Sequence, residues 1–281
     1  MLEWLTEEKL PIGKWAKRSV DWLIDNAGFA VDTFSNWLQG MIGALLWLLE
    51  LPHPLVFTLL TVGLAVWLKR SWQFPLFVVV SLLLIINQGY WEEMIQTLAL
   101  VLAGAIVCML VGVPIGILAA HNPRFSALLR PVLDLMQTIP TFVYLIPALI
   151  LFGLGMVPGL FATVIFAIAA PIRLTELGVS SVPKQLVEAG KAFGATRMQL
   201  LWKIELPYAI PSIMAGLTQT IMLSLSMVVI AAMVGAPGLG VPVLRALNTV
   251  NIAKGFEAGL VIVLVAILLD RFLRYERESE K

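Results

Sequence analysis

Long apolar runs that carry no charged side chain limit the fold of this chain more than any other feature. The segment Met94–Ala120 is one such run, without a single Asp, Glu, Lys or Arg. A helix of about 20 mostly apolar residues crosses the hydrocarbon core of a bilayer. Because the run is longer than that, we predict that it spans a membrane.

The composition agrees with a membrane protein. The chain is 59% hydrophobic and 13% charged, whereas soluble domains have roughly 45–50% apolar and about 25% charged residues. The net charge is +1 and the basic residues are scattered, so no nucleic-acid partner is expected. Cys108 is the single cysteine, and neither His53 nor His121 belongs to a cluster with ligand spacing. We therefore expect no disulfide within the chain and no metal site.

The length rule predicts about seven membrane spans. Gly and Pro occur inside several of them, which membrane helices tolerate because neighbouring helices satisfy the freed backbone groups. We expect an all-α fold, a polytopic transmembrane helical bundle. The predicted spans are Leu55–Leu68, Pro75–Asn87, Met94–Ala120, Phe142–Met156, Leu160–Val179, Ile210–Val234 and Phe256–Leu269.

The N-terminal stretch Ile12–Met41 differs from the spans, because charged residues alternate with apolar ones at helical spacing. Its tryptophans favour an amphipathic helix that lies in the membrane interface. The alternative is an ordinary amphipathic helix packed on the rest of the protein. Gly40–Leu51 is apolar but short, and is a candidate re-entrant or half-span segment. The start, Met1–Pro11, lacks the basic region and apolar core of a signal peptide.

Lysine and arginine concentrate at alternate connections between the predicted spans, which indicates orientation. Among the poorer connections, Gln88–Glu93 is acidic and Val157–Gly159 is neutral. The alternation predicts a cytoplasmic C-terminus and 184–203 loop, with the N-terminus outside. A further span near Gly40–Leu51 would reverse the N-terminus alone. The basic connections contain Lys69–Arg70, Arg124, Arg130, Lys184, Lys191, Arg197, Lys203, Arg271, Arg274 and Arg277.

These patterns divide the chain into four parts. An amphipathic interfacial segment covers residues 1–51, and the first two spans cover 52–90. The main transmembrane domain covers 91–272, and a cytoplasmic tail covers 273–281.

The loop at 183–207, between the fifth and sixth predicted spans, is the most informative segment. Pro183 suits the first turn of a helix, where its missing N–H is not needed. Gly194 permits a sharp turn between two short helices. Pro207 then opens the next span.

Six positions of this loop resemble the EAA loop of binding-protein-dependent ABC permeases, which reads Glu-Ala-Ala, three residues, Gly, nine residues, Ile, one residue, Leu-Pro. The matching residues are Glu188, Ala189, Gly194, Ile204, Leu206 and Pro207. Gly190 stands where the family usually has Ala, which softens the helix by roughly 0.5–1 kcal/mol. The resemblance implies that the loop, with Gly190 and Ala195 included, docks on a cytoplasmic ATPase and transmits its motion. The alternative is a helical hairpin without a special role.

The resemblance extends over about residues 88–271. Leu133–Pro147, Leu223–Ala231 and Gly238-Leu239-Gly240 are similar to permeases of the glycine betaine, proline betaine and choline branch. This implies a multi-pass subunit of the bacterial cytoplasmic (inner) membrane that imports a quaternary amine by alternating access. It also implies a homodimer, a separate ATPase and a separate substrate-binding protein.

The chain lacks the Gly-x-x-x-x-Gly-Lys-Ser/Thr loop that holds nucleotide phosphates. We therefore expect a transport subunit rather than an enzyme, with no cofactor of its own and with ATP bound by the partner. An ion-coupled secondary transporter or channel is the competing class. It would need charges near the middle of its spans, and the third, sixth and seventh predicted spans have none there.

A quaternary ammonium group is best held over aromatic faces. Four aromatic residues are candidates for the translocation pathway, and three hydroxyl residues are candidates for a polar strip beside it. The alternatives are an interfacial aromatic belt, ordinary packing, and hydroxyl bonds to the residue's own helix. The candidates are Tyr90, Trp91, Phe142, Tyr144, Thr220, Ser224 and Ser226.

Two pairs of opposite charge occur at helical spacing. Arg130 and Asp134 are four residues apart, and Arg173 and Glu176 are three apart. Ionisable groups at membrane depth are a functional hypothesis by default. Both pairs lie near predicted cytoplasmic ends of spans, so structural pairing within each helix is favoured.

Overall fold

The computed structural model describes residues 11–68 and 72–273, and every regular element within them is helical. This follows from the apolar sequence, because a helix satisfies its backbone polar groups within its own segment, as a membrane interior requires. Expectations for Met1–Leu10, Lys69–Arg70, Arg274 and Arg277, and for the tail beyond Leu273, lie outside the described residues.

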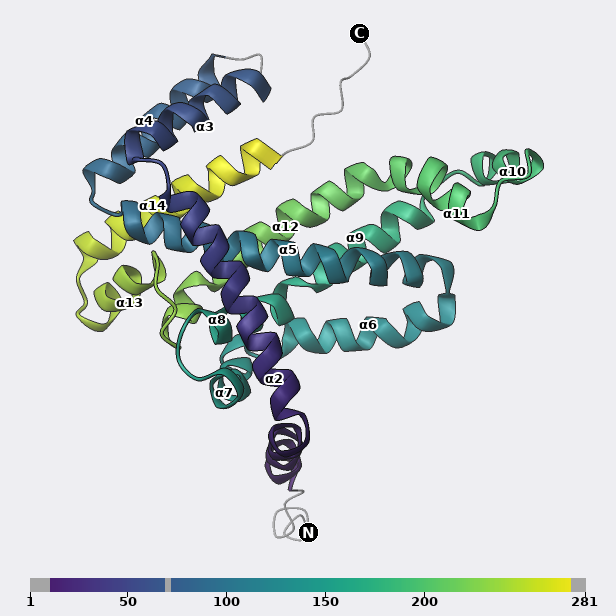
Figure 1. Cartoon of the computed structure of the whole chain (residues 1–281), viewed down its shortest axis with the longest axis horizontal. Coiled ribbons are helices and arrows are strands. Elements are labelled where there is room, and N and C mark those ends of the chain that lie inside the picture. Colours follow the sequence, from purple (N-terminus) through teal and green to yellow (C-terminus); the bar gives the residue numbers. More distant parts are fainter. Residues whose placement is uncertain (1–10, 69–71, 274–281) are drawn as a thin grey trace, which may run out of the picture.

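The all-α prediction is confirmed (Figure 1). The helices are α2 (Ile12–Glu50), α3 (Pro54–Leu68), α4 (Gln73–Asn87), α5 (Trp91–His121), α6 (Pro123–Thr138), α7 (Thr141–Phe152), α8 (Met156–Ala167), α9 (Ala169–Ser180), α10 (Lys184–Ala192), α11 (Arg197–Leu200), the π-helix η1 (Leu201–Glu205), α12 (Leu206–Ala232), α13 (Gly240–Asn248) and α14 (Ile252–Leu273).

Helices α5, α9 and α12 form the centre of the bundle, and glycines let them approach closely. A Cβ atom at Gly116 of α5 would lie 2.6 Å from the carbonyl oxygen of Ile172 in α9. Gly216 of α12 packs against Pro171 in the same way, at 3.1 Å from its Cα. Small residues at helix contacts are the usual route to tight packing in membranes, where apolar burial gives little driving force.

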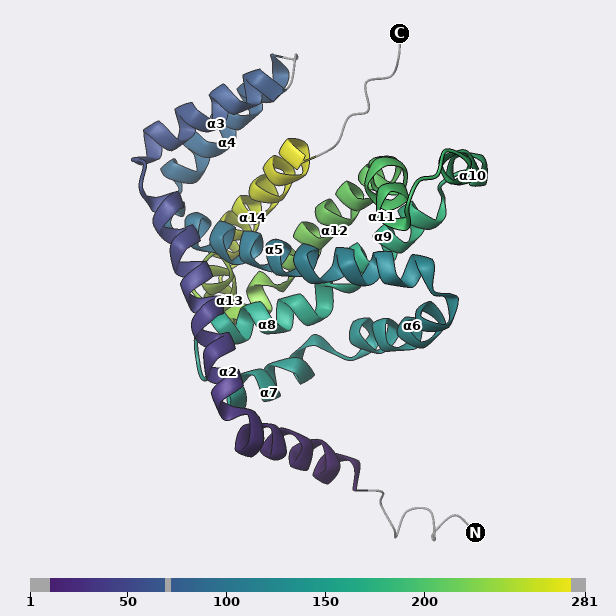
Figure 2. The ribbon, with the colours of Figure 1, turned by 45° about the vertical axis from the view of Figure 1, so that its right-hand side comes forward.

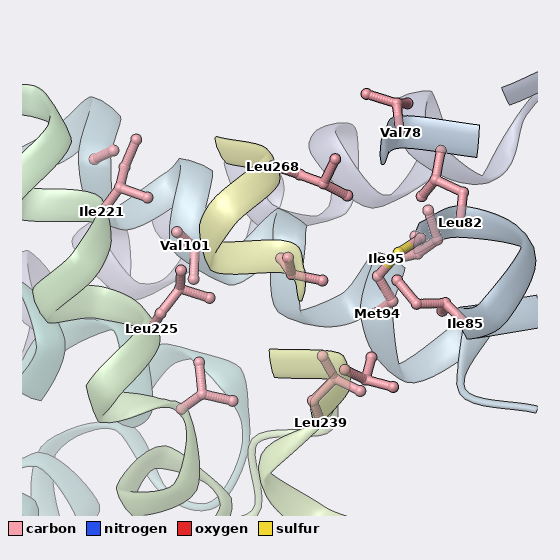
Figure 3. Close-up of a cluster of buried hydrophobic side chains, with 14 of the residues drawn as sticks. Val78, Leu82, Ile85, Met94, Ile95, Val101, Ile221, Leu225, Leu239 and Leu268 are labelled. Carbon is pink, nitrogen blue, oxygen red and sulfur yellow. The ribbon is translucent and has the colours of Figure 1, made fainter. Parts of the chain in front are cut away.

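A second packing region joins α4, α5, α12 and α14. Figure 3 shows its buried side chains, which interdigitate between these helices. Leu239, from the segment before α13, reaches into this cluster and is fully buried. The labelled residues are Val78, Leu82, Ile85, Met94, Ile95, Val101, Ile221, Leu225, Leu239 and Leu268.

The predicted count of about seven spans is not confirmed. Among the described residues four helical segments are long and apolar enough to cross a membrane: Trp91–His121, Met156–Ser180, Arg197–Ala232 and Ile252–Leu273. Two bent pairs raise the number to six. Ile24–Glu50 meets Pro54–Leu68 at 93°, and Pro123–Thr138 meets Thr141–Phe152 at 92°.

Short helices explain the difference in span number. The first two predicted spans form α3 and α4, with 15 residues each, which is below the roughly 17-residue minimum for a bilayer. The fourth predicted span ends early, at Phe152, because Gly153 and Gly155 take φ values of +71° and +138°.

The N-terminal region forms helix α2, which contains the predicted amphipathic stretch Ile12–Met41 and continues through most of Gly40–Leu51. A re-entrant or half-span role for Gly40–Leu51 stays a prediction. The helix is kinked at Ala27, where φ is −124° and ψ is 15°. Its second half packs on the bundle, since Leu38 and Ile42 are each 2% exposed and contact the cluster that contains Leu100 and Leu160. The second half of α2 therefore agrees with the alternative of an amphipathic helix that packs on the rest of the protein. The interfacial position of the first half stays a prediction.

The connections that are rich in basic residues gather at one end of the molecule. The α5–α6 turn and the hairpin formed by α10 and α11 lie there, whereas the α4–α5 and α13–α14 turns lie at the opposite end (Figures 1 and 2). This matches the alternation along the sequence. Which end faces the cytoplasm stays a prediction.

Candidate functional site

The predicted coupling loop folds as a hairpin that projects from the bundle (Figure 2). Helix α10 ends in two reciprocal backbone bonds: the N–H of Ala195 donates to the Gly190 carbonyl at 3.0 Å, and the N–H of Gly194 donates to the Lys191 carbonyl at 2.9 Å. This is the Schellman ending of a helix. It requires a left-handed residue, and Gly194 has φ +76°, a conformation that costs most L-residues about 1–2 kcal/mol.

The next helix begins with a capping box. The Thr196 hydroxyl accepts from the Gln199 backbone N–H at 3.3 Å, and the Gln199 side chain accepts from the Thr196 N–H at 2.8 Å. Helix α11 has four residues and continues through η1 into α12. The second short helix is therefore the N-terminal part of the candidate membrane span Arg197–Ala232 and not a separate helix. A displacement of the hairpin would be carried directly into α12.

Gly190 allows α10 to pack closely against the start of this segment, at Leu200 and Ile204. A Cβ atom at Gly190 would lie 2.6 Å from Leu200 Cδ2 and 2.7 Å from Ile204 Cδ1. Both contacts are ends of flexible side chains, so an alanine would require a small shift. Gly190, which stands where the family usually has Ala, therefore affects the packing of α10 as well as its helix propensity.

The outer face of the hairpin exposes large apolar side chains beside charged ones. Phe193 is 92% exposed, and Met198 and Trp202 are more than 60% exposed. The Trp202 indole N–H donates to the Met198 sulfur at 3.1 Å. Charged residues, among them Glu188, Lys191 and Arg197, are also exposed on this hairpin. Large apolar side chains left exposed on a projecting element suggest an interaction surface.

The other predicted loop residues are distributed over this hairpin. Ala189 and Pro207 are exposed, whereas Ala195, Ile204 and Leu206 are partly buried. The structure therefore brings the matched positions onto one hairpin, in which Gly190 is the small residue that packs against Leu200 and Ile204. A role in coupling stays a prediction.

A side-chain contact between His121 and Glu205, where α5 meets the start of the segment that leads into α12, was not predicted. His121 Nε2, at the end of α5, lies 2.9 Å from Glu205 Oε2 in η1, and His121 Nδ1 lies 2.8 Å from the Ile117 carbonyl oxygen. Glu205 is buried, and this contact ties the end of α5 to η1. Sequence spacing carries no signal for it, because the two residues are 84 positions apart.

Two of the aromatic pathway candidates pack inside the protein. Tyr90 and Trp91 contact the buried cluster shown in Figure 3, and Trp91 meets Phe57 edge to face at 5.4 Å. Burial, and then the carboxylates of Glu257 and Glu93, raise the pKa of Tyr90. These contacts agree with ordinary packing near the ends of α5 and α14, and a pathway role stays a prediction.

The other two aromatic candidates lie at the bend between α6 and α7. The Tyr144 hydroxyl donates to the Met136 carbonyl at 2.7 Å, which fastens α7 to the end of α6. Phe142 is 53% exposed and has no such contact in the described residues. Of the four aromatic candidates, Phe142 is therefore the most accessible.

The three hydroxyl candidates on α12 bond to their own helix. Thr220 donates to the Gly216 carbonyl and Ser224 to the Thr220 carbonyl, each at 2.8 Å, and both side chains are buried. Ser226 donates to the Met222 carbonyl at 3.1 Å and is exposed. The structure does not bring the three together in one open strip.

The charged residues of α6 and α9 pair across the two helices, so the predicted pairing within each helix is wrong. Arg130 lies 3.2 Å from Glu176, and Arg173 lies 2.6 Å from Asp134. The Ser126 hydroxyl also donates to Glu176, at 2.6 Å. We call Arg130, Asp134, Arg173 and Glu176 the α6–α9 charge cluster. It bounds a cavity of about 350 Å³ that Leu177 and Ser180 also line.

Comparison with known proteins is consistent with this architecture. Residues 112–275 match the family described as the binding-protein-dependent transport system inner membrane component. The chain is 46% identical over 275 residues, 97% of either chain, to the glycine betaine/carnitine transport permease protein GbuB of Listeria monocytogenes. It is 44% identical to the glycine betaine transport system permease protein OpuAB of Bacillus subtilis, over 97% of this chain and 96% of that one.

A solved structure has the same fold. The MetNI methionine ABC transporter in an inward-facing conformation aligns with a TM-score of 0.57 and 23% identity, over 64% of this chain and 92% of that one. Together with the matched family and the hairpin, these similarities establish that the chain belongs to the permease subunits of binding-protein-dependent ABC transporters of the bacterial inner membrane.

Proposed function

We propose that this chain is the permease subunit of an importer for a quaternary amine, namely glycine betaine, proline betaine or choline. The observation that carries the substrate class is the similarity to a glycine betaine/carnitine permease, at 46% identity over 97% of both chains. The relative from Escherichia coli, a glycine betaine/proline betaine permease, is 40% identical over 93% of this chain and 74% of its own length.

The proposed mechanism is alternating access. Two copies of the chain pair around a central pathway, and a separate ATPase docks on each hairpin. ATP draws the hairpins together and opens the pathway toward a substrate-binding protein, and hydrolysis resets it inward. ATP is bound by the partner, and this chain uses no cofactor of its own.

The hairpin supports this mechanism in two ways. Its exposed aromatic side chains, Phe193 and Trp202, suit insertion into a cleft of a partner protein. Its continuous connection to α12 makes it a lever on a membrane-spanning helix. A displacement of α11 is therefore carried along one continuous helical segment to the centre of the bundle.

The positions of charges argue against an ion-coupled transporter. Such a protein needs ionisable groups near the middle of its spans. The middle turns of α5, α12 and α14 hold no acidic or basic residue, and in the span Met156–Ser180 the charged residues Arg173 and Glu176 lie in the last two turns.

Uptake by whole cells tests the substrate class. The chain would be produced with its ATPase and binding protein in a bacterium without its own importers of quaternary amines. We expect uptake of radiolabelled glycine betaine, and none of maltose, a dipeptide or zinc. Uptake of one of those solutes, with no quaternary amine transported, would reject the proposal.

A further inference from the structure

The α6–α9 charge cluster lies between the middle of α6 and the last two turns of α9, where it lines an open cavity. Helix α6 runs back alongside α5 from the turn at Pro123 (Figure 1). With a rise of about 1.5 Å per residue, Arg130 and Asp134 lie about 10 Å and 16 Å along α6 from that turn. Glu176 and Arg173 lie about 6 Å and 10 Å from the end of α9 at Ser180. Ionisable side chains of a membrane protein that line a cavity, as these do, mark a candidate site for a solute.

The two ion pairs of the cluster differ in their exposure and in the number of their side-chain partners. The Glu176 side chain is 15% exposed and accepts from both Arg130 and the Ser126 hydroxyl. The side chains of Arg173 and Asp134 are 42% and 65% exposed. No second side-chain partner for either is found among the described residues. Exposed ion pairs of this kind are weak. Arg173–Asp134 is therefore the pair that a solute can open.

The cavity suits a small solute with both charges. Two arginines and two carboxylic acids give the cluster a formal net charge of zero. Its volume of about 350 Å³ is near the lower limit of ordinary ligand pockets. A zwitterion that enters between Arg173 and Asp134 would replace both partners, because its carboxylate accepts from the guanidinium and its cationic end faces the Asp134 carboxylate. A cation without a carboxylate would leave Arg173 unpaired.

We propose that the α6–α9 charge cluster is a solute-binding site of the permease that selects net-neutral zwitterions over cations. The carboxylate of the solute binds Arg173, and its quaternary ammonium group faces Asp134. The ammonium methyl groups contact Leu177, which lines the same cavity. The inference rests on the proposed function and narrows its substrates to betaines rather than choline.

Changes of one charge test the inference. Glycine betaine and choline share a trimethylammonium group, but only glycine betaine has a carboxylate. Import of both would be measured in the complete reconstituted importer, with one unchanged binding protein that delivers both amines. A change in the ratio of their kcat/KM values then reports on the permease alone.

Arg173→Gln should lower the ratio of glycine betaine to choline, and Asp134→Asn should raise it. The expected change is roughly tenfold to a hundredfold, the value of one charge-assisted hydrogen bond. Arg173→Lys is the control that retains the charge, and its ratio should stay near the wild-type value. The double exchange Arg173→Asp with Asp134→Arg retains net neutrality and should restore the ratio.

A purely structural ion pair gives a different result. Each single variant would then slow both amines by the same factor, and this unchanged ratio would overturn the inference while leaving import of quaternary amines intact. Failure of the wild-type importer to take up either amine would instead reject the proposed function.

A second measurement covers variants that do not assemble. Ser180→Cys in a Cys108→Ser background places a thiol at the wall of the cavity. Glycine betaine should slow its modification by a thiol reagent more than choline does at the same concentration. Equal rates with both amines would also overturn the inference.

Discussion

Gly194→Asp is the change that tests the coupling hairpin most sharply. The residue has φ +76°, and no atom lies within 4 Å of the position of an added Cβ. A side chain therefore meets open space, and the backbone is strained. Most L-residues would lose about 1–2 kcal/mol here, whereas Asp and Asn adopt this conformation more readily. The hairpin should fold in the variant, and the protein should insert normally.

The main effect of Gly194→Asp should come from its charge. Position 194 adjoins Phe193 on the face that we propose to dock on the ATPase. A charge buried without a partner costs about 3–5 kcal/mol, which corresponds to a loss of coupling of roughly two to four orders of magnitude. Gly194→Asn has nearly the same shape and backbone preference but no charge, so it is the matched control.

ATP-dependent uptake in proteoliposomes measures this loss, and co-purification of the ATPase measures docking. We expect Gly194→Asn to retain most of the uptake and Gly194→Asp to abolish it, with equal amounts of both variants in the membrane. Normal uptake by Gly194→Asp would mean that this hairpin is not the element that transmits the motion of the ATPase.

Three further predictions follow from the fold and the proposed partners. Gly116→Ala should lower the thermal stability of the detergent-solubilised protein, because its Cβ would lie 2.6 Å from a backbone oxygen and overpacking costs about 1–3 kcal/mol. Gly63→Ala, where an added Cβ meets open space, is the control. Equal melting temperatures of the two variants would contradict the close packing at Gly116. In a Cys108→Ser background, Gln88→Cys should react with an impermeant thiol reagent outside the cell and Lys191→Cys should not; outside labelling of position 191 would reject the orientation. Replacing the binding protein by a relative with another amine preference should shift the preferred betaine, and a preference that stays unchanged would place amine selection in the permease.

Features coded by neighbouring residues were predictable from the sequence. The length of the apolar run is enough to predict helix α5. Pro183 and Gly194 are enough to predict two short helices with a turn between them. The capping residues Thr196 and Gln199 act within three positions of each other. Because these signals are local, the sequence predicts the helical fold and the site of the hairpin.

Features that depend on packing between distant segments were not predictable. The pairing of Arg130 with Glu176 spans 46 positions, so helical spacing favoured partners on the same helix. The 92° bend between α6 and α7 follows Ile139, whose ψ of 130° ends α6 before Pro140. The fourth predicted span begins at Phe142, after this bend, so the sequence predicted where α7 starts but not the angle at which it meets α6.

The central claim is that ATP hydrolysed by a separate subunit drives solute import through this chain. Proteoliposomes without any ion gradient, containing the permease, its ATPase and its binding protein, test the claim directly. We predict that internal ATP drives accumulation of glycine betaine, and that the purified permease alone neither binds nor hydrolyses ATP. Accumulation driven by an ion gradient without ATP, or hydrolysis by the permease alone, would contradict the account.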